Sequence, residues 1–282
     1  PLKERLIEQR GIKYIVSTRK PYEHLPERSS TSLRTVSTIP YRIDLAGGWL
    51  DQPFVSKYHP GSVITISIEP TIEFNERSGM ASSTRQKAVE IWNHAIPPGN
   101  LFNLAKILFS YDNPPGTKEF SGSQDALGIV LPGLNKLDYN NEYWPSKIKS
   151  IHEDSILNWI EDHLYLVNLG PRHNSYSVLD NTCINLQNVA CLAEAAENCW
   201  KAIQTMDLSN FGDSVRRSFE MQVQIFPNML DKNIEKIIDK YRDVAFGWKL
   251  SGAGGGGYII LIAEKEIERA IKIKIRRKSQ QI

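Results

Sequence analysis

The stretch Ser78-Gly79-Met80-Ala81-Ser82-Ser83-Thr84 runs directly into residues 85–92, Arg-Gln-Lys-Ala-Val-Glu-Ile-Trp, which have the pattern of a helix. A glycine and small hydroxyl residues before a first helical turn leave backbone N–H groups unpaired and pointing one way, an arrangement that binds phosphate. The hydroxyls of Ser82, Ser83 and Thr84 can add hydrogen bonds to the anion or reach a magnesium ion. An ordinary helix cap is the alternative interpretation, so the decision depends on the rest of the chain.

A second stretch, Pro40-Tyr41-Arg42-Ile43-Asp44-Leu45-Ala46-Gly47-Gly48-Trp49-Leu50-Asp51, alternates charged with apolar residues and then bends at two glycines. Strand spacing places Arg42 and Asp44 on one face, and the bend delivers Trp49 and Asp51 beside them. An indole next to a carboxylate is typical of a sugar pocket, because the ring stacks on C–H groups while the carboxylate accepts paired hydroxyls. An edge strand with a solvated face, followed by a turn, is the alternative.

Two later segments also place small residues beside reactive ones. Ser121-Gly122-Ser123-Gln124-Asp125 offers an aspartate that is either a helix cap or a positioned base. Residues 249–257, Lys-Leu-Ser-Gly-Ala-Gly-Gly-Gly-Gly, lead into an apolar strand over 258–263. A flexible linker seldom runs directly into a buried strand, so this glycine run favours close approach to a ligand or to another lobe.

Hydrophobic periodicity predicts the remaining elements. The expected strands are 12–16, 62–68, 71–74, 164–172 and 272–277. The expected helices are an opening one that stops near Gly11, then 101–111, 186–206, 208–226, 233–241 and 264–271. Cys183, Cys191 and Cys199 are too few for a disulfide framework and lack the close pairing of zinc sites, so we expect buried thiols.

The composition points to a globular protein in the cytoplasm. The chain has 282 residues, of which 41% are hydrophobic and 23% charged, with a formal net charge of +2. This near-neutral balance gives no reason for a nucleic-acid or membrane partner. No apolar run is long enough to span a bilayer, and the first residues carry acids where a signal peptide would not.

Taken in order, the four segments resemble the motifs of the GHMP kinase superfamily, which includes galactokinase, homoserine kinase, mevalonate kinase and phosphomevalonate kinase. The Gly-Gly-Trp-x-Asp sequence of the first motif is similar to that of fucokinases, and Gly-Gly-x-x-Asp also occurs in heptose kinases. The resemblance implies an α+β, two-lobed fold, with a lobe like domain 2 of ribosomal protein S5 and a ferredoxin-like lobe. We expect an N-terminal arm over 1–34, a first lobe over 35–175 that carries the catalytic residues, and a second lobe over 176–282.

The same resemblance implies a role for each motif residue. Asp125 would be the catalytic base, with Arg42 beside it to keep it ionised and to offset charge on the transferred phosphoryl group. Asp51, Trp49 and Gly48 would bind the sugar, and Ser83 and Asp112 would bind magnesium. The residues expected to border ATP are Ser78, Gly79, Met80, Ala81, Ser82, Ser83, Thr84, Gly252, Gly254 and Gly255.

Two departures from the family pattern affect these expectations. The phosphate loop has Ala81 where the family usually has glycine, and Asp112 stands near the place of the family's metal-binding glutamate. The expected function is ATP- and Mg²⁺-dependent phosphorylation of a monosaccharide at its anomeric hydroxyl, by a monomer or homodimer. The alternative is a kinase-like regulatory protein that binds sugar or nucleotide without transferring phosphate.

Overall fold

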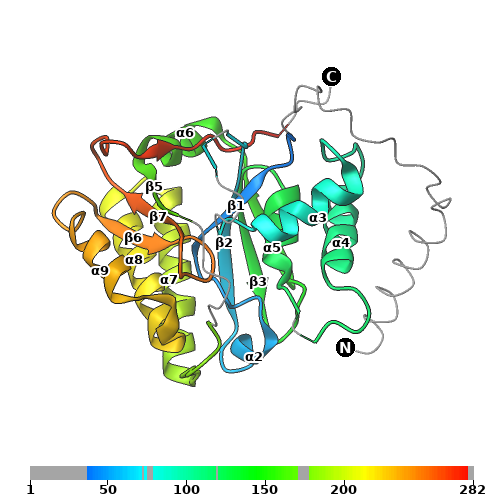
Figure 1. Ribbon diagram of the computed structural model, residues 1–282, viewed down its shortest axis with the longest axis horizontal. Coiled ribbons are helices and arrows are strands. Elements are labelled where there is room, and N and C mark those ends of the chain that lie inside the picture. The colour runs from blue at the N-terminus through cyan, green and yellow to red at the C-terminus, as the bar shows by residue number, and fades with distance from the viewer. Residues whose placement is uncertain (1–36, 72, 75–78, 119, 171–177, 279–282) are drawn as a thin grey trace.

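The computed structural model describes residues 37–71, 73–74, 79–118, 120–170 and 178–278 (Figure 1). The predicted elements before residue 37, and Ser78 of the phosphate loop, lie outside these residues. The strands are β1 (Tyr41–Ala46), β2 (Gly61–Ile68), β3 (Leu134–Tyr139), β4 (Lys147–Ile151), β5 (Leu164–Gly170), β6 (Gly247–Leu250), β7 (Gly257–Ile262) and β8 (Ile271–Lys272). The helices are α2 (Pro53–Ser56), α3 (Ser82–Trp92), α4 (Leu101–Asp112), α5 (Ser123–Val130), α6 (Asp154–His163), α7 (Leu186–Gln204), α8 (Leu208–Ile225) and α9 (Lys232–Asp239), with a 3₁₀ turn at Pro227–Met229.

The strands form two antiparallel sheets. The first sheet has the order β1-β2-β3-β4 and the second has the order β6-β7-β5-β8. The described part of the chain therefore has the predicted α+β character. The predicted lobe boundary at residue 175 stays a prediction, and we note that β5, which precedes it, pairs with β7 and β8 of the second sheet.

Helices cover the first sheet on both faces. Helix α5 packs against β1 and β2 on one face, with α3 and α4 beside it, while α7 and α8 contact the same strands from the other face. Helix α8 also contacts β6 and β7, so it lies between the two sheets, as Figure 1 shows. Strand β1, which carries the motif residues, is thus enclosed between α5 and α8.

Most predicted elements are confirmed within a few residues, and two are wrong. Residues 71–74 do not form the expected strand where they are described, because β1 and β3 already occupy both edges of β2. Residues 264–271 do not form the expected helix. This segment crosses from β7 past β5 to β8 through bends and a turn, and Arg269 has φ 60°, a left-handed conformation that a right-handed helix excludes.

The charged residues of β1 are buried, so the alternative interpretation of this stretch as an edge strand with a solvated face is wrong. Although β1 is an edge strand, Arg42 and Asp44 are only 4% and 3% exposed. The prediction of buried thiols holds only for Cys199, because Cys191 is half-buried and Cys183 is exposed. Position 183 lies before α7, outside the packed face of that helix.

The segment after β7 joins both sheets. Strand β8 pairs with β5 through Lys272 and Ile271, and Ile275 then forms a bridge with Ile68 of β2. The backbone N–H of Arg276 donates to the carbonyl of Ser67 at 2.8 Å. The predicted strand at 272–277 is therefore short, and part of its pairing is with the other sheet.

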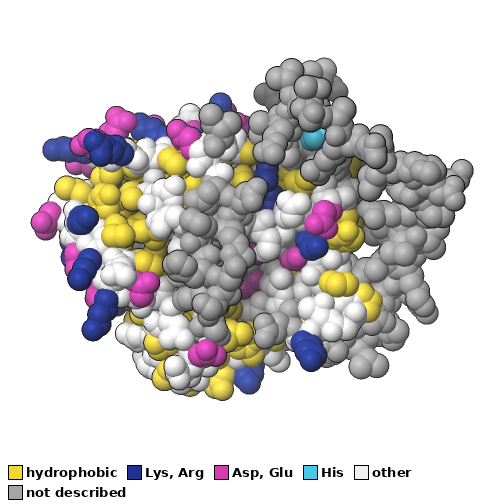
Figure 2. All heavy atoms as spheres, in the orientation of Figure 1, with side chains coloured by type: hydrophobic (Ala, Val, Ile, Leu, Met, Phe, Trp, Pro, Cys, Tyr) yellow, Lys and Arg dark blue, Asp and Glu magenta, His cyan; other side chains and the backbone are white. Residues whose placement is uncertain are grey.

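The described surface is mixed in charge. Figure 2 shows positive and negative side chains intermingled on the visible face. None of the helices in the described ranges has the length and apolarity needed to cross a bilayer.

The two glycine-rich motifs contact each other directly. Gly252 has φ 61°, and a Cβ added there would lie 2.3 Å from the carbonyl oxygen of Gly79. Gly79 has φ 70°, and its Cβ would lie 2.5 Å from the carbonyl oxygen of Ser251. The glycine run thus serves close backbone contact between the phosphate loop and the β6–β7 connection, not a flexible linker.

We expect Gly252→Ala to lower the free energy of unfolding by about 2–5 kcal/mol, because it adds left-handed strain of about 1–2 kcal/mol to overpacking of about 1–3 kcal/mol. Gly170→Ala is the matched control, since Gly170 has φ 81° and nothing within 4 Å of an added Cβ. Urea denaturation of both variants measures the difference. Equal losses in the two variants would contradict the proposed backbone contact.

Candidate active site

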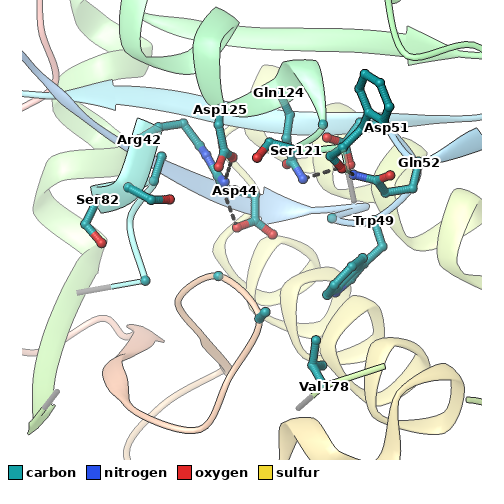
Figure 3. A pocket seen from close by; sticks show the side chains of 18 of the residues that line it. Arg42, Asp44, Trp49, Asp51, Gln52, Ser82, Ser121, Gln124, Asp125 and Val178 are labelled. Atoms are coloured by element: carbon teal, nitrogen blue, oxygen red, sulfur yellow. Dashed lines mark hydrogen bonds and ion pairs between the residues drawn. The ribbon is translucent and has the colours of Figure 1, made fainter. Parts of the chain in front are cut away.

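One cavity of about 1280 Å³ brings together residues of β1 in the first sheet and of the connection between β6 and β7 in the second sheet. Its walls come from β1, the bend after β1, the N-terminal turns of α3 and α5, helix α8, and residues Gly252 and Ala253. Figure 3 shows Ser82 at one end, Arg42, Asp44 and Asp125 in the middle, and Asp51 with Trp49 at the other end. Segments far apart in the sequence therefore converge on a single elongated hollow.

Arg42 joins two carboxylates at the centre of the cavity. Its Nη1 donates to Asp44 Oδ1 at 2.7 Å, and its Nη2 forms an ion pair with Asp125 Oδ1. Burial alone would lower the pKa of Arg42, but the charges of Asp125 and Asp44 outweigh this effect and raise the pKa. Arg42 thus stays cationic, and its planar fork fixes the direction of both carboxylates.

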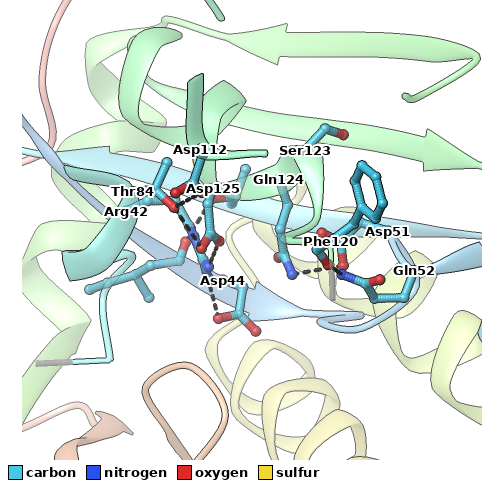
Figure 4. Close-up of polar contacts among 12 residues, drawn as sticks. Arg42, Asp44, Asp51, Gln52, Thr84, Asp112, Phe120, Ser123, Gln124 and Asp125 are labelled. Atoms are coloured by element: carbon cyan, nitrogen blue, oxygen red, sulfur yellow. Dashed lines mark hydrogen bonds and ion pairs between the residues drawn. The ribbon is translucent and has the colours of Figure 1, made fainter. Parts of the chain in front are cut away.

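Asp125 lies in the first turn of α5 and is not the helix cap, a position that Gly122 occupies. Thr84 connects Asp125 with Asp112, as Figure 4 shows: its hydroxyl donates to Asp112 Oδ2 at 2.7 Å and lies 3.5 Å from Asp125 Oδ2. Burial raises the pKa of Asp112, and the nearby charge of Asp125 adds to this effect. The hydroxyl of Thr84 therefore lies between two carboxylates, of which Asp125 lines the cavity and Asp112, a predicted magnesium ligand, does not.

The N-terminus of α3 fits the binding of an anion. Within the described residues no side chain caps this helix, as is also the case for α2, α5 and α6. Its N-cap residue, Ala81, has φ 56° and ψ 33°, the left-handed conformation that glycine adopts at least cost. The alanine that replaces the family's glycine thus keeps the loop geometry, and Ser82 and Ser83 line the cavity.

Asp51 occupies the opposite end of the cavity and is 1% exposed. Its Oδ1 accepts a hydrogen bond from Gln124 Nε2 at 2.9 Å, and its Oδ2 is buried without a partner. Burial, with a smaller contribution from the charge of Asp125, raises the pKa of Asp51 to about 7. An unpaired buried carboxylate oxygen is costly, so this end of the cavity suits a ligand that donates hydrogen bonds.

Aromatic side chains surround Asp51. Trp49 lines the cavity, and its indole stacks on Phe226 with ring centroids 4.4 Å apart. Phe120 and Tyr143 also line the cavity, and their ring centroids lie 5.3 Å apart. One end of the cavity therefore combines apolar faces with a few polar atoms.

Not every predicted site residue borders the cavity. Gly48, Gly79 and Gly252 line it, whereas Gly254 and Gly255 do not. An added Cβ at Gly254 would meet the carbonyl oxygen of Met229 at 2.4 Å, so this glycine serves packing. Met80 belongs to the hydrophobic core, and Thr84 is buried behind the loop.

Three polar residues of the site were absent from the sequence-based set. Gln124 donates to Asp51, Gln222 of α8 donates to the carbonyl of Gly48 at 3.1 Å, and Lys249 of β6 contacts Asp44. The amide oxygens of both glutamines are buried without a partner. Gln124 precedes the predicted base directly, and this position could have identified it as a site residue. Gln222 lies on an amphipathic helix, and no sequence pattern there indicates a role in the site.

The residues present fit ATP and Mg²⁺. The uncapped turn of α3 and the left-handed Ala81 suit phosphate oxygens. Asp112 supplies a carboxylate beside Thr84 in the first turn of α3, and Mg²⁺ in phosphoryl-transfer sites is commonly bound by one or two carboxylates together with substrate phosphates. No cluster of three or more His, Cys, Asp or Glu side chains occurs in the described ranges.

The fold is shared with solved kinases of small molecules. Residues 199–277 match the family model of the GHMP kinases C terminal. Lactococcus lactis galactokinase, solved with galactose, superposes with a TM-score of 0.59 at 13% identity, over 86% of this chain and 94% of that chain. A D-glycero-D-manno-heptose 1-phosphate kinase from Bacteroides thetaiotaomicron superposes with a TM-score of 0.51 at 12% identity, over 84% and 95% of the two chains.

The chain also has a curated relative. This chain is 26% identical over 174 residues to the L-fucokinase/L-fucose-1-P guanylyltransferase of Bacteroides fragilis. The matched region is 54% of this chain and 17% of that protein. Residues 199–277 thus match the C-terminal family model, the chain has the fold of solved GHMP kinases, and the resemblance predicted from the sequence is confirmed.

Proposed function

We propose that this chain transfers the γ-phosphoryl group of ATP to the anomeric hydroxyl of a free monosaccharide. The observation that carries the proposal is the position of Asp125. It lies between the uncapped turn of α3 and the unpaired oxygen of Asp51 in one cavity, as Figure 3 illustrates. A sugar bound at Asp51 and a nucleotide bound at α3 would therefore meet at this carboxylate.

The chain's own residues account for each part of the transfer. Asp125 accepts the proton of the sugar hydroxyl while that oxygen forms a bond to the γ-phosphorus and the bond to the β–γ bridging oxygen breaks, releasing ADP. Arg42 offsets the charge on the transferred group. The first-turn N–H groups of α3 and the hydroxyls of Ser82 and Ser83 orient the phosphates. Asp112 and Ser83 would hold Mg²⁺, which neutralises phosphate charge when bound.

The other end of the cavity supports a sugar as the acceptor. Asp51 Oδ2, Gln124 Oε1 and Gln222 Oε1 are three buried acceptors without partners, and several sugar hydroxyls would satisfy them. Trp49, Phe120 and Tyr143 offer apolar faces for C–H groups. Fucose, a heptose and galactose are the candidates, because relatives and structural neighbours are named for these sugars.

The test is an ADP-release assay with ATP, Mg²⁺ and a panel of fucose, galactose, mannose and heptoses, with ³¹P NMR of the product to identify the phosphorylated position. One sugar should stimulate ADP release well above the rate without sugar and yield a sugar 1-phosphate. If calorimetry detects binding of a sugar but no sugar yields ADP, the chain is a sugar-binding regulatory protein instead.

Sugar binding should strengthen as the pH rises through 7. Asp51 has a pKa of about 7, so about a tenth of it is ionised at pH 6 and about nine-tenths at pH 8. Because only the carboxylate accepts two hydroxyl hydrogen bonds, we expect the Kd for the sugar to be about tenfold lower at pH 8 than at pH 6. Calorimetric titration without nucleotide measures it. Asp51→Asn should bind weakly with no such trend, and a trend that persists in this variant would assign the effect to another group.

A further inference from the structure

A fully buried lysine reaches the catalytic centre from the second sheet. Lys249 of β6 has no exposed surface, and its Nζ donates to the backbone carbonyl of Asp44 at 2.6 Å and to Asp44 Oδ2 at 2.5 Å. The other oxygen of the same carboxylate accepts from Arg42 at 2.7 Å. Asp44 is therefore shared between two cations, one from each sheet.

The proposed phosphoryl transfer assigns no role to Lys249, yet a buried ammonium group is expensive to keep. Burial lowers the pKa of Lys249, and the charge of Asp44 opposes this effect. Without the lysine, one positive charge on Arg42 would face two carboxylates, the buried Asp44 and the half-buried Asp125. With it, the four charges Lys249, Asp44, Arg42 and Asp125 balance.

We propose that Lys249 is a positioning residue that neutralises Asp44 and so leaves the charge of Arg42 available to Asp125 and the phosphoryl group. This inference rests on the proposed phosphoryl transfer. It predicts that the charges of Lys249 and Asp44 matter as a pair: loss of the lysine alone leaves Asp44 competing with Asp125 for Arg42. Loss of both charges leaves the Arg42–Asp125 pair intact, since an asparagine oxygen at position 44 can still accept from Nη1.

The test is a double-mutant cycle of Lys249→Met and Asp44→Asn. Methionine is close to lysine in length, so it fills much of the same space without the charge. We expect Lys249→Met to lower kcat about 10–100-fold through misplacement of the reacting groups, with KM for ATP and sugar within about threefold of wild type. The double variant should regain a kcat within about tenfold of wild type and above that of Lys249→Met.

Lys136→Met is the matched control. Lys136 is also buried, at 5% exposure, but its partners Glu197 and Asp138 do not line the cavity, whereas Asp44, the partner of Lys249, does. Its kcat should stay within about twofold of wild type. A Lys249→Met variant with unchanged kcat, or single-variant losses that simply multiply in the double variant, would overturn the inference.

A stability measurement separates failure of this inference from failure of the proposed function. If the wild-type protein phosphorylates no sugar, the proposed function fails. The coupling between Lys249 and Asp44 is then measured from the urea unfolding midpoints of the same single and double variants. The charge pairing then predicts that Lys249→Met lowers the midpoint more than the double variant does, because the single variant keeps an uncompensated buried carboxylate. A double variant at or below the midpoint of Lys249→Met contradicts the pairing.

Discussion

Asp125→Asn is expected to reduce kcat by about 10²–10⁴-fold, the range that general-base catalysis contributes. Asparagine preserves the size of the side chain but cannot take the proton of the acceptor hydroxyl. It can still accept a hydrogen bond from Arg42, so the site should remain assembled. The KM for ATP should change by less than about threefold, because Asp125 is assigned to the acceptor side of the transferred group. Steady-state kinetics with the sugar identified in the panel measures both quantities.

Asp239→Asn serves as the control for this variant. Asp239 lies on α9, and its carboxylate pairs with Arg242 in an exposed position. The same chemical change there should leave kcat unaltered. If Asp125→Asn kept full activity, the assignment of the base would be refuted, whereas loss of nucleotide binding would place Asp125 in the nucleotide site instead.

Asp51→Asn is expected to raise the KM for the sugar about 10–100-fold. Hydrogen bonds to a charged acceptor contribute about 1.5–3 kcal/mol each, and the unpaired Oδ2 of Asp51 is the strongest such acceptor at its end of the cavity. The KM for ATP should stay within about twofold, because α3 lies at the other end. Initial-rate kinetics with each substrate varied separately measures the split.

Gly122→Ala gives an independent check of the same carboxylate. A Cβ at this position would lie 1.5 Å from Asp51 Oδ2, so the alanine must displace the carboxylate without removing it. Its sugar KM should rise in the same direction as that of Asp51→Asn. Unchanged sugar kinetics in both variants would exclude Asp51 from the sugar site.

The motif residues could be predicted from the sequence because each motif is a local signal. The alternation along β1 indicated a strand that carries Arg42 and Asp44, and the glycine and serine before Asp125 fitted either a helix cap or a positioned base. The structure places Arg42 against Asp125, which strand alternation alone does not establish. The order of the motifs supplied that expectation through the family resemblance.

The remaining site residues depend on packing between segments, which no local pattern reports. Gln222 lies on a helix whose apolar spacing indicates only a buried face, and Lys249 precedes a glycine run that drew attention to the backbone instead. Their partners, Gly48 and Asp44, are far away in the chain. Similarly, the conformation of Ala81 could not be read from the sequence, because alanine normally avoids left-handed backbone geometry.

The bridge between Ile275 and Ile68 has a consequence for biosynthesis. Strand β2 precedes residues 274–276 in the chain, so the carbonyl of Ser67 and the backbone N–H of Glu69 receive their partners only after this later segment has left the ribosome. Contacts of such long sequence separation form late and slow the final step of folding. The nascent polypeptide therefore carries an incomplete edge of the first sheet from the synthesis of β2 until that of residues 274–276, and chaperones would protect it best during this interval.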